Sequence, residues 1–272
     1  MRSGRGSTRT PNVVVCRSVR TLQGVPTAFC EWINGASLRE SIRDGSLYEG
    51  PAEEVESRLF DIARQAAQAL RHVHGQGLVH CDVKPGNLLI SRDRAVRLND
   101  FGLATRCAKQ GEAEHNDRAP GCTPAYCPAE QAQGRPPKPW KDEYAWALTV
   151  LEMYLGERCW STGAEAKEAF DGYPSACRVP LPEDMAKLLR LCLKWKVNDG
   201  SVVVKELERM TVSHAGTAEK PASAETQETM ATVSEEPMPP EAPKAPAAKP
   251  DPREESPKKS FFARLFGRRK GR

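Results

Sequence analysis

Long hydrophobic runs are missing from this sequence, and their absence argues against a transmembrane helix. No stretch approaches the roughly 18 consecutive apolar residues that such a helix needs. The first ten residues, MRSGRGSTRT, are basic and have no apolar core, so they do not form a secretory signal. The nine cysteines include no C-x-x-C pair, which argues against a disulfide framework or a zinc site. We therefore expect a cytoplasmic protein with reduced thiols.

Acidic residues are missing from the C-terminal end of the chain, and this changes the meaning of the net charge. The formal net charge is +4, but residues 258–272 hold seven basic residues and no acid. Subtracting these seven positive charges from the net charge of +4 leaves a net charge of −3 for the rest of the chain. We therefore expect no nucleic-acid partner for the body of the protein, and any basic surface is confined to this segment.

Apolar residues recur with the periods of amphipathic helices and short strands, so the sequence predicts an α+β fold. The clearest helix runs from Pro51 to His74, with one apolar face formed by Leu59, Ile62, Ala63, Ala66, Ala69, Leu70 and Val73. Before this helix we expect two strands within 12–33 that begin at Val13, a break at 34–37, and a short helix capped by Ser37. After it we expect strands at 78–79, 88–90 and 96–98, an irregular stretch over 103–139, and a helix over 142–155. The segment 182–210 is expected to be helical, with Leu188, Leu189, Leu191 and Leu193 buried.

Two polar loops follow neighbouring short strands and carry the residues with chemistry. The loop His80-Cys81-Asp82-Val83-Lys84-Pro85-Gly86-Asn87 comes first, and Asn99-Asp100-Phe101-Gly102 follows the next strands. Side-chain oxygens of Asn87 and Asp100 are suited to hard cations such as Mg²⁺. A carboxylate, Asp82, and a cation, Lys84, share the first loop and can act on an attacking hydroxyl and on a phosphoryl group. Each residue alone is more often a solvated loop residue, but together they indicate phosphoryl transfer.

The two loops match, in order and spacing, the catalytic loop and the Asp-Phe-Gly motif of the protein kinases, so the sequence resembles that family in its Ser/Thr type. The resemblance implies a kinase-like domain over 12–210. Residues 12–34 would be the remnant of the small lobe and the hinge, and 35–210 the mainly helical large lobe (C-lobe). Residues 1–11 and 211–272 are expected to be disordered, because they contain too few apolar groups to offset chain entropy.

The resemblance also implies a role for each matching residue. Asp82 corresponds to the catalytic base and Lys84 to the phosphate-facing lysine of Ser/Thr kinases. Asn87 and Asp100 correspond to the Mg²⁺ ligands, and Asn87 also belongs to the catalytic loop. ATP and a Ser/Thr-containing protein are the implied substrates.

Other matching residues are implied to bind adenine or to support the site. The segment Glu31-Trp32-Ile33 resembles the hinge, so Glu31 and Ile33 are expected at the adenine ring, with Leu89 beneath it and Cys30 at the gatekeeper position. The expected supporting residues are His80 and Phe101 as a stacked pair, Asp142 as the brace of the catalytic loop, Thr123 to Tyr126 as the peptide-docking segment, and Glu130 as the acid that closes the activation segment.

The sequence departs from the family pattern before the hinge. It has no Gly-rich loop, no strand lysine for the α- and β-phosphates, and no helix glutamate to pair with that lysine. The resemblance therefore implies a small lobe that begins near the family's fourth strand. Two explanations stay open: a truncated or misread gene, and a genuine kinase-like scaffold without this part of the lobe.

A second group of departures lies around the activation segment. Cys81 replaces the arginine that pairs with a phosphorylated loop, and Thr105 is the only hydroxyl residue between Leu103 and Cys122. We therefore expect an activity that loop phosphorylation does not switch, which a required loop phosphate found by mass spectrometry would contradict. The arginine partner of Glu130 is also missing near 198–201, so a buried Glu130 would be costly.

The C-terminal segment 258–272 is basic and aromatic. Its residues Phe261, Phe262, Leu265 and Phe266 are compatible with one helical face, which would suit an anionic membrane surface or a calmodulin-like partner. A solvated tail or a nuclear address fits equally well. For the whole chain, the hypotheses are a catalytic Ser/Thr kinase, a catalytically inactive kinase-like binding module and, last, an unrelated helical adaptor.

Overall fold

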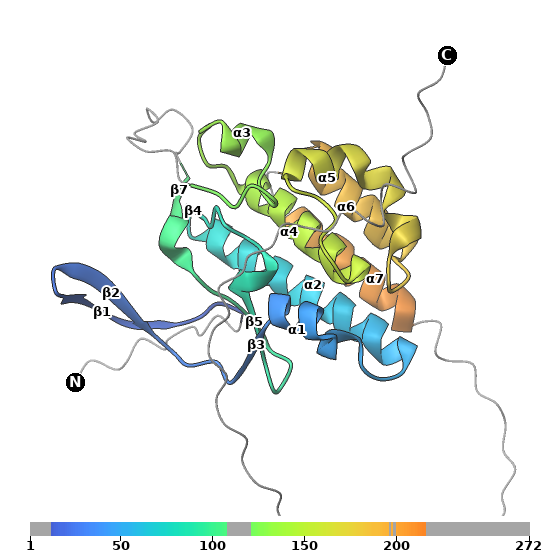
Figure 1. The fold of residues 1–272 in the computed structure, drawn as a ribbon, viewed down its shortest axis with the longest axis horizontal. Coiled ribbons are helices and arrows are strands. Elements are labelled where there is room, and N and C mark those ends of the chain that lie inside the picture. The colour runs from blue at the N-terminus through green and yellow to red at the C-terminus, as the bar shows by residue number, and fades with distance from the viewer. Residues whose placement is uncertain (1–11, 108–120, 196, 198–199, 216–272) are drawn as a thin grey trace, which may run out of the picture. The chain divides into compact units, whose positions relative to one another are not determined.

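A computed structural model describes residues 12–107, 121–195, 197 and 200–215. The predicted disorder of 1–11 and the basic segment 258–272 both lie outside these residues. Within them the fold is α+β, as the sequence predicts, with small sheets beside a larger group of helices (Figure 1). No helix of the described part is long and apolar enough to span a membrane.

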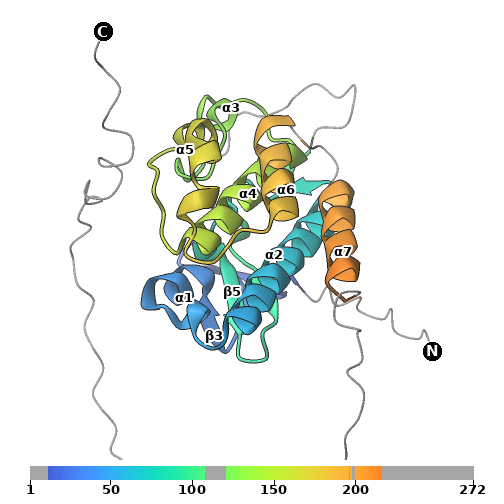
Figure 2. The ribbon, with the colours of Figure 1, turned by 90° about the vertical axis from the view of Figure 1, so that its right-hand side faces the viewer.

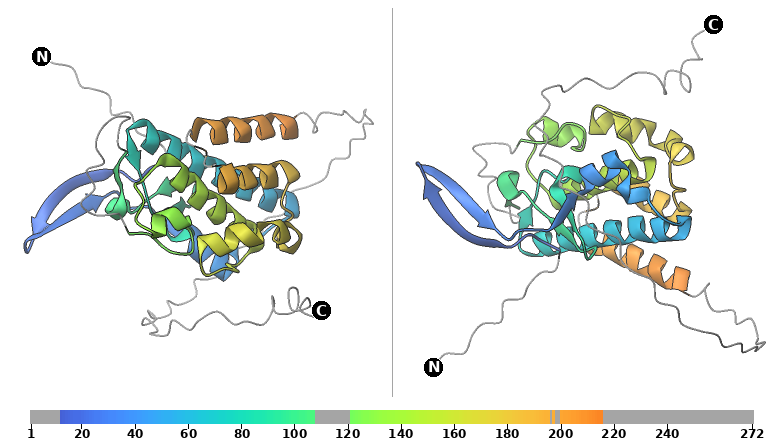
Figure 3. Two further views of the ribbon diagram at one scale, coloured as in Figure 1. Left: turned by 90° about the horizontal axis from the view of Figure 1, so that it is seen from above. Right: turned by 60° about the horizontal axis from the view of Figure 1, so that its bottom comes forward.

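The N-terminal strands form a hairpin, with β1 at Cys16–Leu22 and β2 at Val25–Cys30. Gln23 and Gly24 form its turn with left-handed φ angles of 50° and 83°. The expected start of the first strand at Val13 is wrong, because Val13 instead bridges to Leu98 in a different sheet. The hairpin extends away from the helices in both views of Figure 3 and in Figure 1.

A three-stranded antiparallel sheet joins the hairpin to the helices. Its order is β3 (Gly35–Ser37), β5 (Leu88–Ser91) and β6 (Val96–Leu98). The two predicted strands of this region are confirmed, whereas the expected break at 34–37 contains β3. Gly35 permits this pairing, because a Cβ at this position would lie 1.9 Å from the Ile90 carbonyl oxygen. A separate pair is formed by β4 (Leu78–Val79) and β7 (Thr105–Arg106).

Two helices confirm the sequence pattern closely. Helix α1 (Leu38–Asp44) begins at a capping box in which Ser37 and Glu40 exchange hydrogen bonds, and it ends at Gly45 with φ 83°. Helix α2 spans Ala52–Gly75, and all seven residues of its predicted apolar face are buried. Between them lies the 3₁₀ turn η1 (Ser46–Tyr48).

Helix α4 (Pro139–Leu155) forms the centre of the helical group. It begins three residues before the predicted Asp142, because Pro139 provides a favourable first helical residue, and Gly156 ends it with φ 84°. All its residues from Trp140 onward are buried, and the Trp146 indole donates to the Ala63 carbonyl of α2 at 3.0 Å. Figure 2 shows α2 beside α7, with α4 and α6 on its other side.

The C-terminal part of the fold differs from the prediction in three places. The segment 182–210 is two helices, α6 (Glu183–Trp195) and α7 (Gly200–Ala215), and α7 continues past the expected start of disorder at 211. Leu188, Leu189 and Leu193 are buried as predicted, whereas Leu191 is only half-buried.

The remaining short elements are two helices and four 3₁₀ turns of the described residues: α3 (Ala129–Ala132), α5 (Gly163–Ala169), η2 (Pro85–Asn87), η3 (Phe101–Leu103), η4 (Phe170–Gly172) and η5 (Pro174–Ala176). Both α3 and β7 lie in the stretch that was predicted to be irregular.

Candidate active site

The loop between β4 and β5 is held by a buried carboxylate on α4. Asp142 accepts the backbone N–H groups of His80 and Cys81 at 2.7 and 2.8 Å, and it is 1% exposed. Cys81 takes a left-handed φ of 68°, which turns its amide toward this carboxylate. The His74 ring nitrogen lies 2.9 Å from the same side chain. Asp142 therefore braces the loop backbone as the sequence resemblance implies.

Asp82 is the centre of a compact polar cluster. Its Oδ2 atom lies 2.6 Å from the Lys84 ammonium, and its Oδ1 atom accepts the Thr123 hydroxyl at 2.6 Å. Lys84 also donates to the Thr123 oxygen at 2.9 Å. The Asn87 amide nitrogen donates to the Asp82 carbonyl at 2.8 Å. The structure thus brings Asp82, Lys84 and Asn87 together around one carboxylate, which is 8% exposed.

The two predicted oxygen ligands lie at adjoining strand ends. The Asn99 N–H donates to the Asn87 carbonyl at 2.9 Å, which sets Asp100 one residue from that contact. Asn87 uses its amide nitrogen as a donor to Asp82, and no donor of the described part binds its Oδ1 atom. Asp100 is exposed, has φ 63°, and accepts the Gly102 N–H at 3.3 Å. Both side chains therefore offer an oxygen of the type that Mg²⁺ binds.

A ring contact supports the second loop. The His80 and Phe101 rings are 4.8 Å apart in an edge-to-face arrangement, and the His80 Nε2 atom lies 3.0 Å from the Asn99 carbonyl. This pairing links the loop that carries Asp82 to the loop that carries Asp100. The expected pairing of His80 with Phe101 is therefore present, but the rings meet edge to face and are not stacked.

The residues predicted to meet adenine line one cavity of about 300 Å³. Glu31, Ile33 and Leu89 all contribute to its wall, with Cys30 beside them. Glu31 is held in place because its N–H donates to the Val15 carbonyl at 2.9 Å, while its carboxylate accepts the Val15 N–H at 3.0 Å. Asn99 also lines the cavity, which places the cavity beside the Asp-Phe-Gly loop.

Two supporting contacts were not predicted from the sequence. Gln131 of α3 is 5% exposed and donates to the Cys81 carbonyl at 2.7 Å. Thr123, expected only in peptide docking, bonds directly to both Asp82 and Lys84. No local signal marks Gln131, because its partner lies 50 residues away in the chain.

The structure shows the surroundings of two departures from the expected pattern, at Cys81 and at Glu130. Burial raises the pKa of the Cys81 thiol to about 12, so this position supplies no charge where an arginine is expected. Glu130 is half-buried rather than buried, so the cost expected for a buried acid does not apply.

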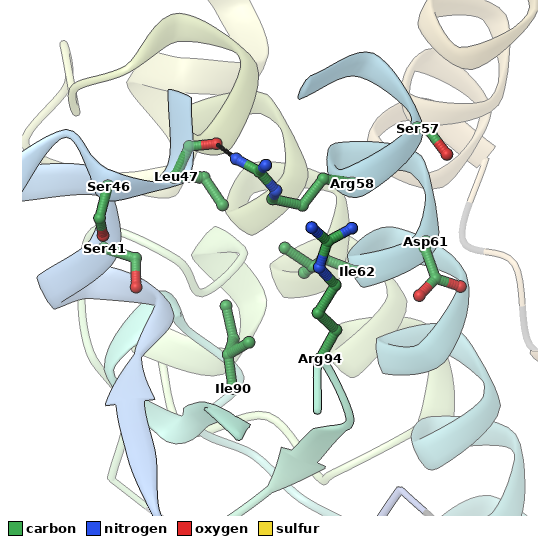
Figure 4. Close-up of a pocket in the computed structure, with 9 residues that line it drawn as sticks. All are labelled: Ser41, Ser46, Leu47, Ser57, Arg58, Asp61, Ile62, Ile90 and Arg94. Carbon is green, nitrogen blue, oxygen red and sulfur yellow. Dashed lines mark hydrogen bonds between the residues drawn. The ribbon is translucent and has the colours of Figure 1, made fainter. Parts of the chain in front are cut away.

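A second cavity, of about 250 Å³, lies apart from these residues (Figure 4). Leu47, Ile62 and Ile90 form its apolar part, and the Arg58 and Arg94 side chains enter it from α2 and from the turn after β5. Arg58 donates to the Leu47 and Glu49 carbonyls at 2.8 and 3.0 Å, so it holds the η1 turn against α2. No residue of the predicted site lines this cavity.

The fold is a helical lobe with a small sheet. One of its loops carries a carboxylate, a lysine and an amide, and the next carries Asp-Phe-Gly. Together these features define the class of phosphoryl-transfer domains. Comparison with known families agrees with this class. The sequence profile described as "Protein kinase domain" matches residues 5–209, which is most of the chain. The chain belongs to the protein kinase family, and its helices form the large lobe of that fold beside part of the small lobe.

Proteins similar to this chain in bacteria and in a nematode are named as serine/threonine-protein kinases. The chain is 32% identical over 133 residues to serine/threonine-protein kinase PknB of Mycolicibacterium smegmatis, which covers 49% of this chain and 20% of that protein. It is 36% identical over 135 residues to serine/threonine-protein kinases drp72 of Corynebacterium efficiens, covering 48% and 24%. Its match to serine/threonine-protein kinase chk-1 of Caenorhabditis briggsae is 26% over 159 residues, covering 58% and 31%. The chain thus spans less than a third of the length of these relatives.

Proposed function

We propose that this chain carries the catalytic part of a protein serine/threonine kinase, which transfers the γ-phosphoryl group of ATP to a protein hydroxyl. The observation that carries the proposal is the cluster in which Lys84 and the Thr123 hydroxyl meet the Asp82 carboxylate. Membership of the protein kinase family and the names of its relatives support the same chemistry. Because the chain matches only part of those relatives, its substrates and partners belong to the proposal.

Asp82 is proposed to orient the acceptor hydroxyl and to take its proton. The Thr123 hydroxyl donates to its Oδ1 atom at 2.6 Å, and a substrate serine or threonine presents the same chemical group. Lys84 is proposed to balance negative charge on the transferred phosphoryl group, since its ammonium lies in the same cluster. Asp142 braces the backbone of this loop through two hydrogen bonds.

The nucleotide is proposed to bind in the cavity of about 300 Å³, with Glu31 and Ile33 at the adenine edge and Leu89 beneath the ring. Asn87 and Asp100 are proposed to hold Mg²⁺ through their side-chain oxygens. When bound, the ion neutralises charge on the phosphate oxygens. The support for this part is that the cavity and both oxygen ligands adjoin Asn99.

The test of this proposal is Asp82→Asn in the full chain, with Mg²⁺ and ATP and a mixture of serine- and threonine-containing peptides. Loss of the base is expected to lower turnover by about 10²–10⁴-fold. Asp93→Asn is the matched control, because Asp93 is an exposed carboxylate in the turn between β5 and β6. Thermal unfolding of both variants separates a catalytic effect from misfolding. Unchanged turnover in Asp82→Asn would reject the assignment of the base.

A catalytically inactive binding module is the second candidate function. The observation behind it is that the sequence has no Gly-rich loop and no lysine in β1 or β2, the strands before the hinge. The two candidates predict different responses to nucleotide. A rise in melting temperature with Mg²⁺ and ATP supports the kinase, whereas an unchanged melting temperature together with no phosphoryl transfer supports the binding module.

A cytoplasmic location and a tail contact are proposed from the sequence alone. Segment 258–272 is proposed to bind an anionic membrane surface through its basic residues and Phe261, Phe262 and Phe266. A calmodulin-like acidic partner is the alternative. Sedimentation of the full chain with anionic vesicles is compared with its sedimentation with neutral vesicles. Binding of the full chain to Ca²⁺-loaded calmodulin is measured separately. Equal sedimentation with both vesicle types would remove the membrane proposal.

A further inference from the structure

Two cysteines enclose the segment that contacts the catalytic carboxylate. Cys122 immediately precedes Thr123, Cys127 follows four residues later, and their Sγ atoms are 2.7 Å apart. We propose that Cys122 and Cys127 are an oxidation site, forming a reversible disulfide that alters how Thr123 meets Asp82 and Lys84. The formation of the bond stands on this geometry alone. Its effect on activity rests on the proposed kinase function.

The backbone between the two cysteines turns back on itself. The N–H groups of Tyr126 and Cys127 donate to the Thr123 carbonyl at 2.9 and 3.2 Å, so the segment is a closed turn. An S–S bond is about 2.05 Å long, so the sulfur atoms need to approach by less than about 1 Å. The bond therefore requires only a small change in the turn.

The two thiols differ in their access to an oxidant. Cys122 is half-buried, whereas Cys127 is buried. Burial, together with the hydrogen bond to Cys122, raises the pKa of the Cys127 thiol to about 12. Because exposed thiolates react first, Cys122 is the sulfur that meets a peroxide, and Cys127 is the sulfur that resolves it.

The chemistry balances with hydrogen peroxide as the oxidant. The Cys122 thiolate attacks one peroxide oxygen, the O–O bond breaks, and a sulfenic acid and hydroxide form. The Cys127 sulfur then attacks the Cys122 sulfur, the S–O bond breaks, and the hydroxyl group leaves as water with the proton of Cys127. Overall, one peroxide and two thiols give one disulfide and two waters, with the sulfurs oxidised and the peroxide oxygens reduced.

The Cys127 side of the loop is fixed, so the Cys122 side has to move. The Trp160 indole donates to the Ala125 carbonyl at 2.8 Å, and the Gly163 N–H donates to the Pro124 carbonyl at 2.9 Å. Gly163 also packs closely on Cys127, because a Cβ there would lie 2.3 Å from the Cys127 carbonyl oxygen.

On the other side, Cys122 is joined directly to Thr123, whose hydroxyl meets both Asp82 and Lys84. Closing the bond therefore displaces Thr123 relative to the catalytic loop. We expect oxidation to lower phosphoryl transfer while nucleotide binding is kept, because neither cysteine lines the cavity of about 300 Å³.

The experiment treats the full chain with hydrogen peroxide, alkylates the remaining thiols and maps the peptides by mass spectrometry. The expected result is a loss of alkylation at Cys122 and Cys127 together, reversed by dithiothreitol. Cleavage after Tyr126 by chymotrypsin should leave two fragments that stay joined until reduction. Alkylation of both residues after peroxide treatment, or a disulfide between Cys122 and any other cysteine, would overturn the proposal.

Variants sharpen the assignment. Cys122→Ser should abolish the linkage, and Cys127→Ser should leave a sulfenic acid at Cys122 that dimedone traps. The matched control is the double variant Cys16→Ser with Cys30→Ser, which removes a cross-strand pair of exposed cysteines in the hairpin. The control should keep the linkage at Cys122, and loss of the linkage in this variant would contradict the proposal.

Failure of the disulfide and failure of the proposed function give different results. Linkage in a chain that shows no phosphoryl transfer before oxidation leaves the disulfide standing and rejects the kinase assignment. Phosphoryl transfer without linkage rejects the disulfide alone. Where both are present, activity that falls on oxidation and returns with dithiothreitol supports the effect on Thr123, and activity that is unchanged on oxidation rejects it.

Discussion

The β1–β2 hairpin and the α2–α4 helix pair show two different ways of holding a structure together. Residues of α4 from Trp140 to Leu155 are all buried, and a hydrogen bond from Trp146 ties that helix to α2. In the hairpin, Val19 and Val25 remain 66% and 61% exposed. The helices are therefore stabilised by tertiary burial, while the hairpin is stabilised by its own cross-strand pairs. Substitutions should accordingly have large effects in the first region and small effects in the second.

The largest expected effect comes from a matched pair of tryptophans. Trp146→Ala removes a side chain that is 0% exposed, and we expect a loss of about 3–5 kcal/mol in the free energy of unfolding. Trp32→Ala, beside the hairpin, removes a side chain that is 90% exposed and should change stability by less than about 0.5 kcal/mol. Urea denaturation measures both, and equal losses would contradict the contrast between the two regions.

The next effect is expected at the brace of the catalytic loop. Asp142→Ala leaves the buried N–H groups of His80 and Cys81 without their acceptor, which should cost about 2–4 kcal/mol. Denaturant unfolding measures the loss. Asp44→Ala is the exposed-carboxylate control, since Asp44 accepts the Ser46 N–H and hydroxyl in an exposed turn. A loss no larger than that of the control would contradict the bracing role.

A smaller effect is expected from a pair of glycines. Gly35→Ala places a methyl group 1.9 Å from the Ile90 carbonyl oxygen, so β3 must move from β5 at a cost of about 1–3 kcal/mol. Gly75→Ala lies in α2 with nothing within 4 Å and should stabilise the protein by about 0.5–1 kcal/mol. Opposite changes in melting temperature for the two variants would confirm the close approach of Gly35 to the Ile90 carbonyl. An unchanged melting temperature in Gly35→Ala would refute it.

The smallest effect concerns pH and the buried acid at the end of α4. Burial raises the pKa of Glu152 above its ordinary value of 4.5, although the Tyr126 hydroxyl bonded to it lowers the pKa in part. The folded state thus holds the proton more tightly than the unfolded state. The contribution of Glu152 to stability is therefore greatest below pH 4.5 and is lost as the pH rises through the folded pKa. A tenfold difference in proton affinity between the two states corresponds to about 1.4 kcal/mol of stability.

Glu152→Gln tests that sign. The variant cannot ionise, so the difference in stability between variant and wild type should move in favour of the variant as the pH is raised from about 4 to about 7. Melting temperatures across that range measure the trend. A difference that stays constant with pH would show that Glu152 does not contribute through its ionisation.

Much of the fold was predictable where the signal is local. The capping box at Ser37 and the apolar face of α2 need only three- and four-residue spacing, and both are confirmed. The pairing of β3 was not predictable, because a three-residue strand at Gly35 depends on a partner strand, β5, that lies far along the chain. The break between α6 and α7 was missed, although the sequence has a turn signal, Asn198-Asp199-Gly200, at that point.

The candidate site divides in the same way. The spacing of Asp82, Lys84 and Asn87, and the Asp-Phe-Gly motif after them, was readable because these residues are neighbours in sequence. The contact of Gln131 with the Cys81 carbonyl was missed, because nothing near Gln131 in the chain indicates it.

The amino-acid sequence alone determined which residues are candidates for the chemistry and which helix faces are apolar, since both follow from side-chain type and local spacing. Only the tertiary structure decided that Thr123 meets Asp82, that Gln131 donates to the Cys81 carbonyl, and that Cys122 faces Cys127. The first two contacts join residues 41 and 50 positions apart, and they exist because close packing of the helices and loops brings those segments together.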